Sequence, residues 1–229
     1  MIRKSIFVSL GLCLTLAATA QRAVVLEAYR KYKIDITAAD SVAAHAFLHY
    51  AFDLHTSIVT EGTEKNYIAR HDPSAPEGAQ WMLKSVNGGA PSRLDLNTFK
   101  KQHSEKIPAP RPDTATFNIV KDDGRELVVS YHYDPASLVP DNEFMKACII
   151  TLTFNATTGR LKKSEAEIAE TFRIKMFKGD HMSSSVTYQF MDDLKRYVPL
   201  REEVSINLKV LGKPLEMITV NEYTNYQRK

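Results

Sequence analysis

The sequence predicts a mainly β protein of the α+β type. We expect a single curved antiparallel sheet of about nine to eleven strands that forms an incomplete barrel, covered by two or three short helices. Three observations predict it: apolar residues recur at every second position, short polar turns join these runs, and helical periodicity occurs in few places. With 44% hydrophobic and 25% charged residues in 229, the composition is that of a globular protein.

The first twenty residues have the pattern of a secretory signal peptide. Arg3 and Lys4 precede an uncharged run that ends in Ala20, with small residues before the predicted cleavage. The apolar stretch within this run is shorter than the roughly 20 residues that a membrane-spanning helix needs. We therefore predict cleavage after Ala20 and a periplasmic or secreted protein that does not span the membrane.

Cysteine content and charge limit the possible partners and chemistry. Cleavage would leave Cys148 as the one cysteine, and its apolar neighbours predict a buried, unreactive thiol. Lipid modification of Cys13 is the alternative to cleavage after Ala20, although bulky Leu12 stands where lipoprotein signals usually carry a small residue. Removal of residues 1–20 takes away two of 30 basic side chains and none of 27 acidic ones, leaving a net charge of about +1. This balance gives no indication of a nucleic-acid partner.

Helices are predicted in three places. The first runs from Ala23 to Tyr32. The second runs from Ser92 to Lys106, where Ser92 is placed to cap the first turn and Leu94 and Phe99 are expected on one face. The third is a short turn of helix from Asp141 to Lys146.

The strands are expected between about Leu48 and Tyr226. Because side chains alternate across a strand, each run should have one buried and one solvated face. The apolar positions are Tyr50, Phe52, Leu54 and Ile58; Phe117 and Ile119; Leu127, Val129, Tyr131 and Tyr133; Cys148, Ile150, Leu152 and Phe154; Phe172, Ile174 and Met176; Met182, Val186, Tyr188 and Phe190; and Val204, Ile206, Leu208 and Val210.

Short polar segments predict hairpins between consecutive strands. They are too short for the crossovers that parallel strands need, so the neighbours should be antiparallel. The predicted turns are Asn87–Gly89, Asp122–Gly124, Asn155–Gly159, Lys178–Asp180 and Gly212–Pro214. The Pro-rich segment 107–112 is expected to be a loop within one domain that covers residues 21–229.

The histidines near the first predicted strand do not form a convincing metal motif. His45 and His49 have the spacing of two ligands on a helical turn, but Ala46 stands where a metalloprotease helix carries glutamate. The strand pattern also places His49, Asp53 and His55 on the solvated face. We expect no metal site.

Other chemical motifs are also lacking in the sequence. There is no Gly-x-Ser-x-Gly elbow and no glycine-rich phosphate loop, and the serine run 183–185 has a strand pattern. The carboxylate pairs 192–193 and 202–203 are expected to be solvated neighbours in loops or strand edges. We predict that the protein is not an enzyme and uses no cofactor.

The alternating strands are unusually rich in aromatic and methionine side chains. Such residues can fill a core, or they can line an apolar cavity inside a curved sheet. If a cavity is present, the residues expected to line it are Tyr50, Phe52, Leu54, Trp81, Tyr131, Tyr188 and Phe190.

Several motifs from Ala69 onward give the chain a family resemblance. They are Ala69-Arg70-His71-Asp72-Pro73, Glu77-Gly78-x-x-Trp81-x-Leu83-x-Ser85-Val86-Asn87-Gly88-x-x-Pro91, Thr116-Phe117-x-Ile119-Val120, Leu127-Val128-Val129-Ser130-Tyr131-x-Tyr133-Asp134-Pro135, Thr158-Gly159-Arg160-Leu161 and Tyr223-Thr224-Asn225-Tyr226. The chain resembles uncharacterised secreted bacterial proteins that are similar to the periplasmic lipoprotein carriers of the LolA and LolB type. The resemblance implies an incomplete barrel around short helices whose concave face shields acyl chains.

Two functions follow from these observations. The first is a soluble periplasmic or secreted protein that holds an apolar ligand, either a lipid or the acyl chains of a lipoprotein, without covalent chemistry. The second is a structural protein with a filled core that binds another envelope protein through a sheet edge or the loop from Pro108 to Thr114. A small outer-membrane barrel fits less well, because the chain has helical segments, a Pro-rich loop and a charged end.

Overall fold

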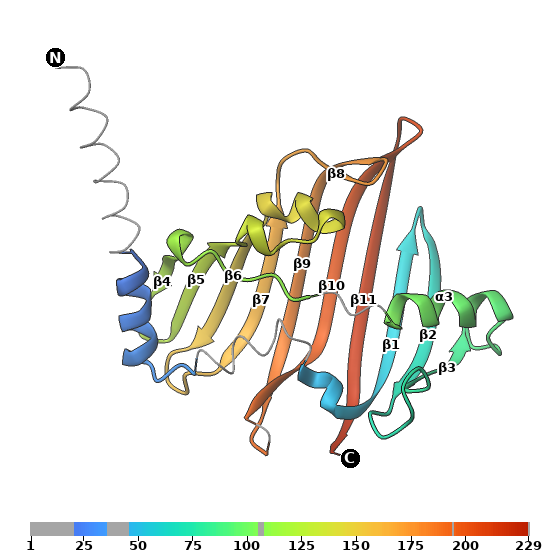
Figure 1. The fold of residues 1–229 in the computed structure, drawn as a ribbon, viewed down its shortest axis with the longest axis horizontal. Coiled ribbons are helices and arrows are strands. Elements are labelled where there is room, and N and C mark those ends of the chain that lie inside the picture. The colour runs from blue at the N-terminus through green and yellow to red at the C-terminus, as the bar shows by residue number, and fades with distance from the viewer. Residues whose placement is uncertain (1–20, 36–45, 105–107, 194, 229) are drawn as a thin grey trace.

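A computed structural model describes residues 21–35, 46–104, 108–193 and 195–228 (Figure 1). Among these residues, eleven strands form one antiparallel sheet in the order β3-β2-β1-β11-β10-β9-β7-β6-β5-β4, with β8 paired to β9. The sheet is open, with β3 and β4 at its edges, so the predicted fold class is confirmed. The strands are β1 (Tyr50–Thr60), β2 (Thr63–His71), β3 (Trp81–Val86), β4 (Asn118–Asp122), β5 (Glu126–His132), β6 (Ile149–Asn155), β7 (Leu161–Ile168), β8 (Phe172–Ile174), β9 (Phe177–Met191), β10 (Arg196–Val210) and β11 (Lys213–Arg228).

Three helical segments occur where the sequence predicts them. Residues 21–31 form the first, α3 (Arg93–Ser104) the second, and the 3₁₀ helix η4 (Pro140–Ala147) the third. Shorter 3₁₀ turns are η1 (Ala46–His49), η2 (Thr114–Thr116) and η3 (Pro135–Ser137). The predicted signal peptide and His45 lie outside the described residues. Within the described part of the chain, no helix is both long and apolar enough to cross a membrane.

The start of α3 is set by a reciprocal cap. The Asp95 backbone N–H donates to Ser92 Oγ over 3.2 Å, while the Asp95 carboxylate accepts from the Ser92 backbone N–H over 3.1 Å. These bonds satisfy amide groups that a helix start leaves without partners. The expected apolar face of α3 is wrong in part, because Phe99 is buried whereas Leu94 is 74% exposed. They are five positions apart in the sequence, which places them about 140° apart around the helix.

Two predicted turns are displaced. Lys178–Asp180 belongs to β9, and the chain reverses at Lys175 and Met176 instead. Gly179 is needed for packing, since a Cβ built there would lie 2.3 Å from Cζ of the Phe172 ring. The predicted turn at Gly212–Pro214 is also displaced, because β11 already begins at Lys213.

Candidate ligand-binding face

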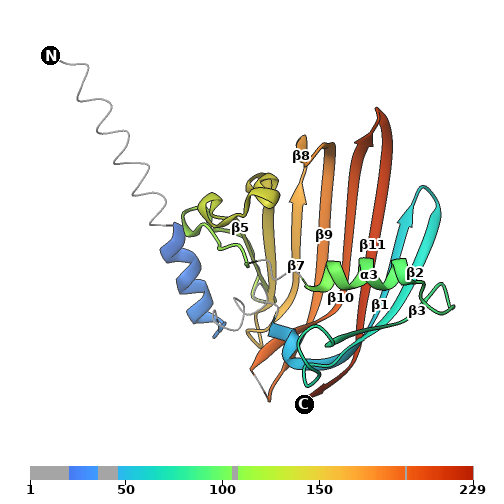
Figure 2. The same cartoon turned by 45° about the vertical axis from the view of Figure 1, so that its right-hand side comes forward.

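The three apolar clusters of the described residues lie on one face of the sheet, which we call the inner face. Side chains two residues apart on a strand point to the same face. On β11, Met217 packs in the cluster that contains Phe144 of η4, and Tyr223 packs in the cluster that contains Phe99 of α3. Leu152 joins the η4 cluster to the one under the N-terminal helix. The helices therefore cover the same face, the near side of the sheet in Figures 1 and 2.

The cluster under α3 is filled by stacked rings. Phe52 is fully buried, and Trp81 lies 5.5 Å from it and 5.9 Å from Phe99, measured between ring centroids. His71 and His103 pack into the same group, and each donates from Nδ1 to a backbone carbonyl. Burial lowers the pKa of both histidines below the usual value of 6.5, so both are neutral at pH 7.

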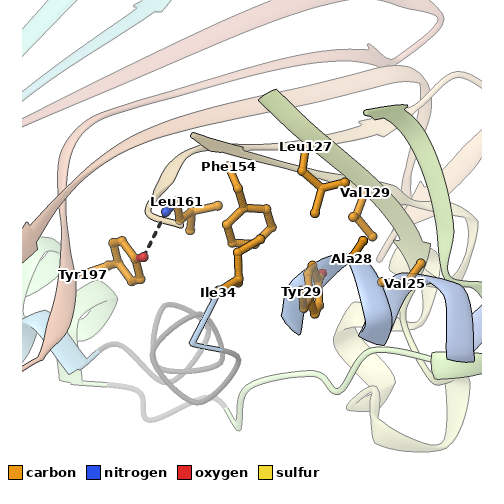
Figure 3. Packing of buried hydrophobic residues seen from close by; sticks show 9 residues of the cluster. All are labelled: Val25, Ala28, Tyr29, Ile34, Leu127, Val129, Phe154, Leu161 and Tyr197. Carbon is orange, nitrogen blue, oxygen red and sulfur yellow. Dashed lines mark hydrogen bonds between the residues drawn. The ribbon is translucent and has the colours of Figure 1, made fainter. Parts of the chain in front are cut away.

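The N-terminal helix closes the other end of the inner face (Figure 3). Val25, Ala28 and Tyr29 pack against strands β5 and β6, with the Tyr29 ring edge-on to Phe154 at 5.5 Å between centroids. Buried Tyr197 accepts a hydrogen bond of 2.9 Å from the backbone N–H of Leu161, as the dashed line in Figure 3 shows. This bond ties the start of β10 to the start of β7.

The third cluster lies under η4. Phe144 stacks on Phe172 of β8 at 5.6 Å between centroids. Cys148 is fully buried there, which confirms the predicted burial, and this burial raises the pKa of its thiol to about 11. A cleft of about 370 Å³ opens between η4 and β8 and is lined mainly by charged side chains.

Between the covered ends, a polar row crosses the inner face from β1 to β10. The Glu202 carboxylate accepts from the Tyr223 hydroxyl over 3.1 Å and from Asn221 Nδ2 over 3.0 Å, and Thr56 donates to Asn221 Oδ1 over 2.7 Å. Burial and then the nearby Glu202 raise the pKa of Tyr223 well above 10. Tyr188 forms a second polar contact with Ser164, over 2.8 Å between the hydroxyl oxygens.

An apolar region, which we call the inner-face track, runs from this row to one end of the sheet. Strand pairing places Val204 opposite Ser184, Ile206 opposite both Met182 and Met217, and Leu208 opposite Leu215. Ile206 is buried and the other apolar side chains are partly buried. The track consists of Met182, Val204, Ile206, Leu208, Leu215 and Met217.

The opposite, outer face is polar, and several of its charges are paired. Burial opposes ionisation of Asp53, but hydrogen bonds from Lys84, Asn225 and Arg70 outweigh it and lower its pKa to about 2. His55 lies 3.7 Å from Glu222 on the same face. A cleft of about 210 Å³ on this face is lined by His55, Ser57, Glu64, Asn66, Arg201, Val220 and Glu222. Among the described residues, no three His, Cys, Asp or Glu side chains converge as metal ligands would.

The seven predicted cavity residues are divided among separate places. Phe52, Leu54 and Trp81 lie together under α3, Tyr188 and Phe190 pack against the cluster of the N-terminal helix, and Tyr131 packs under η4. Tyr50 is buried at the start of β1, where its hydroxyl donates to Asp193 over 2.6 Å. None of the seven lines either of the two clefts.

The polar row and the inner-face track were not predicted as a unit. Glu202 and Glu203 were expected together in a loop or at a strand edge, but they lie within β10, where adjacent positions face opposite sides of the sheet. The alternation of Val204, Ile206 and Leu208 was visible in the sequence. The pairing of β10 with β9 and β11 was not, although it alone brings these residues beside Met182 and Met217.

Comparison with known proteins finds no match, whether with protein-family models, curated proteins or solved structures.

Proposed function

We propose that this protein binds an apolar ligand of the acyl-chain class on the inner face of its sheet and releases it without covalent chemistry. The observation that carries the proposal is the inner-face track, an apolar surface on β9, β10 and β11 whose side chains are partly buried except for buried Ile206. Burial of such a surface by an acyl chain is favourable by roughly 25 cal/mol per Å². The resemblance of the sequence to lipoprotein carriers leads to the same ligand class.

The polar row adds an orientation to this proposal. Glu202, Asn221 and Tyr223 end the track on one side, so an acyl chain on the track would place its polar end at their oxygen and nitrogen atoms. The methionines Met182 and Met217 supply adaptable walls, because an unbranched thioether side chain fits irregular apolar shapes.

The segment after α3 supplies a cover. Residues 108–113 cross in front of the sheet toward β5 (Figure 1), where the Asp113 backbone N–H donates to the His132 carbonyl over 2.8 Å. The Arg111 guanidinium pairs with Asp134 over 3.0 Å at the same end. Earlier in the chain, Phe99 packs α3 on the sheet while Leu94 remains exposed.

The predicted signal peptide indicates where in the cell this function would operate. Export and cleavage after Ala20 would put the protein in the periplasm or outside the cell, where lipids and acylated proteins need shielding from water.

Uptake of a fluorescent apolar probe tests the proposal with matched variants. Val204→Asp puts a charge on the track, whereas Val220→Asp puts the same charge on the outer face of the adjoining strand. We expect Val204→Asp to weaken binding of N-phenyl-1-naphthylamine by on the order of tenfold or more, because the carboxylate must be desolvated under the probe. Val220→Asp should bind as wild type does. Equal binding by both variants, with folding intact by circular dichroism, would contradict the proposal.

Native mass spectrometry of protein purified from a bacterial periplasm tests the natural ligand. A stoichiometric lipid or acylated peptide would support the proposal and identify its class. The alternative is a filled core that serves an interaction protein, and the close packing of Phe52 against Trp81, His71 and Tyr223 favours it at the α3 end. A ligand-free mass together with no probe uptake would favour this alternative.

A further inference from the structure

Two neighbouring hairpin turns carry the most exposed large apolar side chains of the described residues. Leu211 between β10 and β11 is 99% exposed, and Met176 between β8 and β9 is 85% exposed. In the pairing of β9 with β10, Lys209 lies opposite Lys178 and Leu208 lies opposite Gly179. The two turns therefore project from adjacent strands at the same end of the sheet. This end is the upper one in Figure 1. We call segments 172–179 and 208–215 the hairpin tips.

The turn at Leu211 does not need a leucine. Leu211 and Gly212 have φ values of 51° and 80°, a conformation in which a branched side chain is strained. The β1–β2 hairpin makes the same two-residue turn with Glu61 and Gly62, at 50° and 75°. A polar residue therefore serves this turn elsewhere in the chain. At 99% exposure, the leucine contributes no packing to the fold.

The hairpin tips are strongly basic. They contain Arg173, Lys175, Lys178, Lys209 and Lys213 and no acidic residue. Two carboxylates from outside the tips pair with them: Asp180 with Lys209 over 2.7 Å and Asp141 with Lys175 over 3.4 Å. Among the described residues, Lys178 and Lys213 form no ion pair. The tips thus combine apolar side chains with an excess of positive charge.

We propose that the hairpin tips dock on the surface of an anionic lipid bilayer, with Leu211 and Met176 inserted among the acyl chains and the lysines beside the phosphate groups. Single apolar side chains on convex turns suit a fluid bilayer, which closes around them. Lysine stems lie along the apolar boundary while the ammonium groups reach the anionic head groups. A second copy of this chain is disfavoured as partner, because two basic tips repel. The inference does not depend on the proposed ligand.

Flotation with lipid vesicles tests the docking. Protein purified from a bacterial periplasm is mixed with vesicles of phosphatidylcholine alone or with about 30% phosphatidylglycerol. We expect binding to the anionic vesicles that weakens as salt is raised. The double variant Met176→Ser/Leu211→Ser should lose on the order of tenfold or more of its partition. The double variant Lys178→Gln/Lys213→Gln should lose the preference for anionic lipid.

The matched control is Leu94→Ser, which removes a 74% exposed leucine from α3, far along the chain from the tips. It should bind vesicles as wild type does. Three outcomes would each overturn the proposal. The wild-type protein does not bind the vesicles, the Met176→Ser/Leu211→Ser variant binds as well as wild type, or Leu94→Ser loses as much binding as that double variant. Capture of a protein partner by the tips without vesicle binding would overturn it as well.

An environment-sensitive dye locates the contact. Nitrobenzoxadiazole attached to Leu211→Cys should shift to shorter emission wavelength with anionic vesicles, and the same dye on Leu94→Cys should not. The native Cys148 is fully buried and will not compete for the label. An unshifted spectrum at position 211 in vesicle-bound protein would show that the tips remain in water and would reject the proposed insertion.

Discussion

Replacement of Tyr197 by phenylalanine isolates one buried hydrogen bond. The hydroxyl accepts from the Leu161 backbone N–H over 2.9 Å, and Tyr197 and Leu161 are only 4% and 3% exposed. The variant keeps the ring, which packs edge-on to Phe190 at 5.0 Å between centroids, but leaves the amide without its partner. A buried unsatisfied donor costs about 1–3 kcal/mol. For a protein of this size, that loss lowers the melting temperature by roughly 2–12 °C.

Urea denaturation followed by circular dichroism measures this cost. Tyr67→Phe is the matched control, because it also removes one tyrosine hydroxyl, but from a side chain that is only partly buried. The Tyr67 ring lies 5.1 Å from the Lys65 ammonium group, and the variant keeps this ring. The control should change the free energy of unfolding by about 0.5 kcal/mol or less. If Tyr197→Phe were no less stable than Tyr67→Phe, with unchanged denaturant slope, the reasoning about the buried amide would be refuted.

Three further predictions concern packing and titration. Gly179→Ala should destabilise the protein by about 1–3 kcal/mol in urea denaturation, because the new methyl group meets the Phe172 ring. Gly89→Ala should cost less, because the nearest atom to its new methyl group would be 3.6 Å away. Equal losses of stability in the two variants would contradict the argument. Burial lowers the pKa of His71 and His103, so the unfolded chain binds more protons and stability should fall as the pH drops below about 6.5. Fluorescence of Trp81, whose ring lies 4.5 Å from His103, reports this, and an undiminished acid response in His103→Phe would count against it. The Cys148 thiol, with its pKa raised to about 11, should react with a thiol reagent at pH 8 only as fast as the protein opens, and rapid labelling without denaturant would exclude this.

The fold followed from local pattern because each strand shows its faces in its own sequence. The alternation of Leu127, Val129 and Tyr131 identified the buried side of β5 without knowledge of its neighbours. Local reasoning failed at Gly179, which the sequence could not distinguish from a turn glycine because the Phe172 ring that requires it lies across a strand pair. The buried face of α3 was predicted incorrectly for a similar reason. Phe99 is buried by its contact with Trp81 on β3, which the sequence of the helix does not reveal.

The candidate site was harder to predict because it depends on register between distant segments. The polar row joins Thr56 on β1 to Asn221 on β11, 165 positions apart in the sequence. Nothing in either segment specifies this partner, and a shift of one residue would move every apolar side chain of the strand to the other face. Residue types thus identify which side chains can serve an apolar ligand, while the pairing decides which of them meet.

The inner-face track and the hairpin tips can be separated by experiment although they share strands. Leu208 and Leu215 are opposite each other at the end of the track, and the β10–β11 turn with Leu211 follows directly. The proposed ligand site contains neither Met176 nor Leu211, so Met176→Ser/Leu211→Ser should bind the apolar probe as wild type does while losing vesicles. Val204→Asp should show the reverse. If both variants lost both activities, a shared loss of folding would be the simpler explanation, and circular dichroism would detect it.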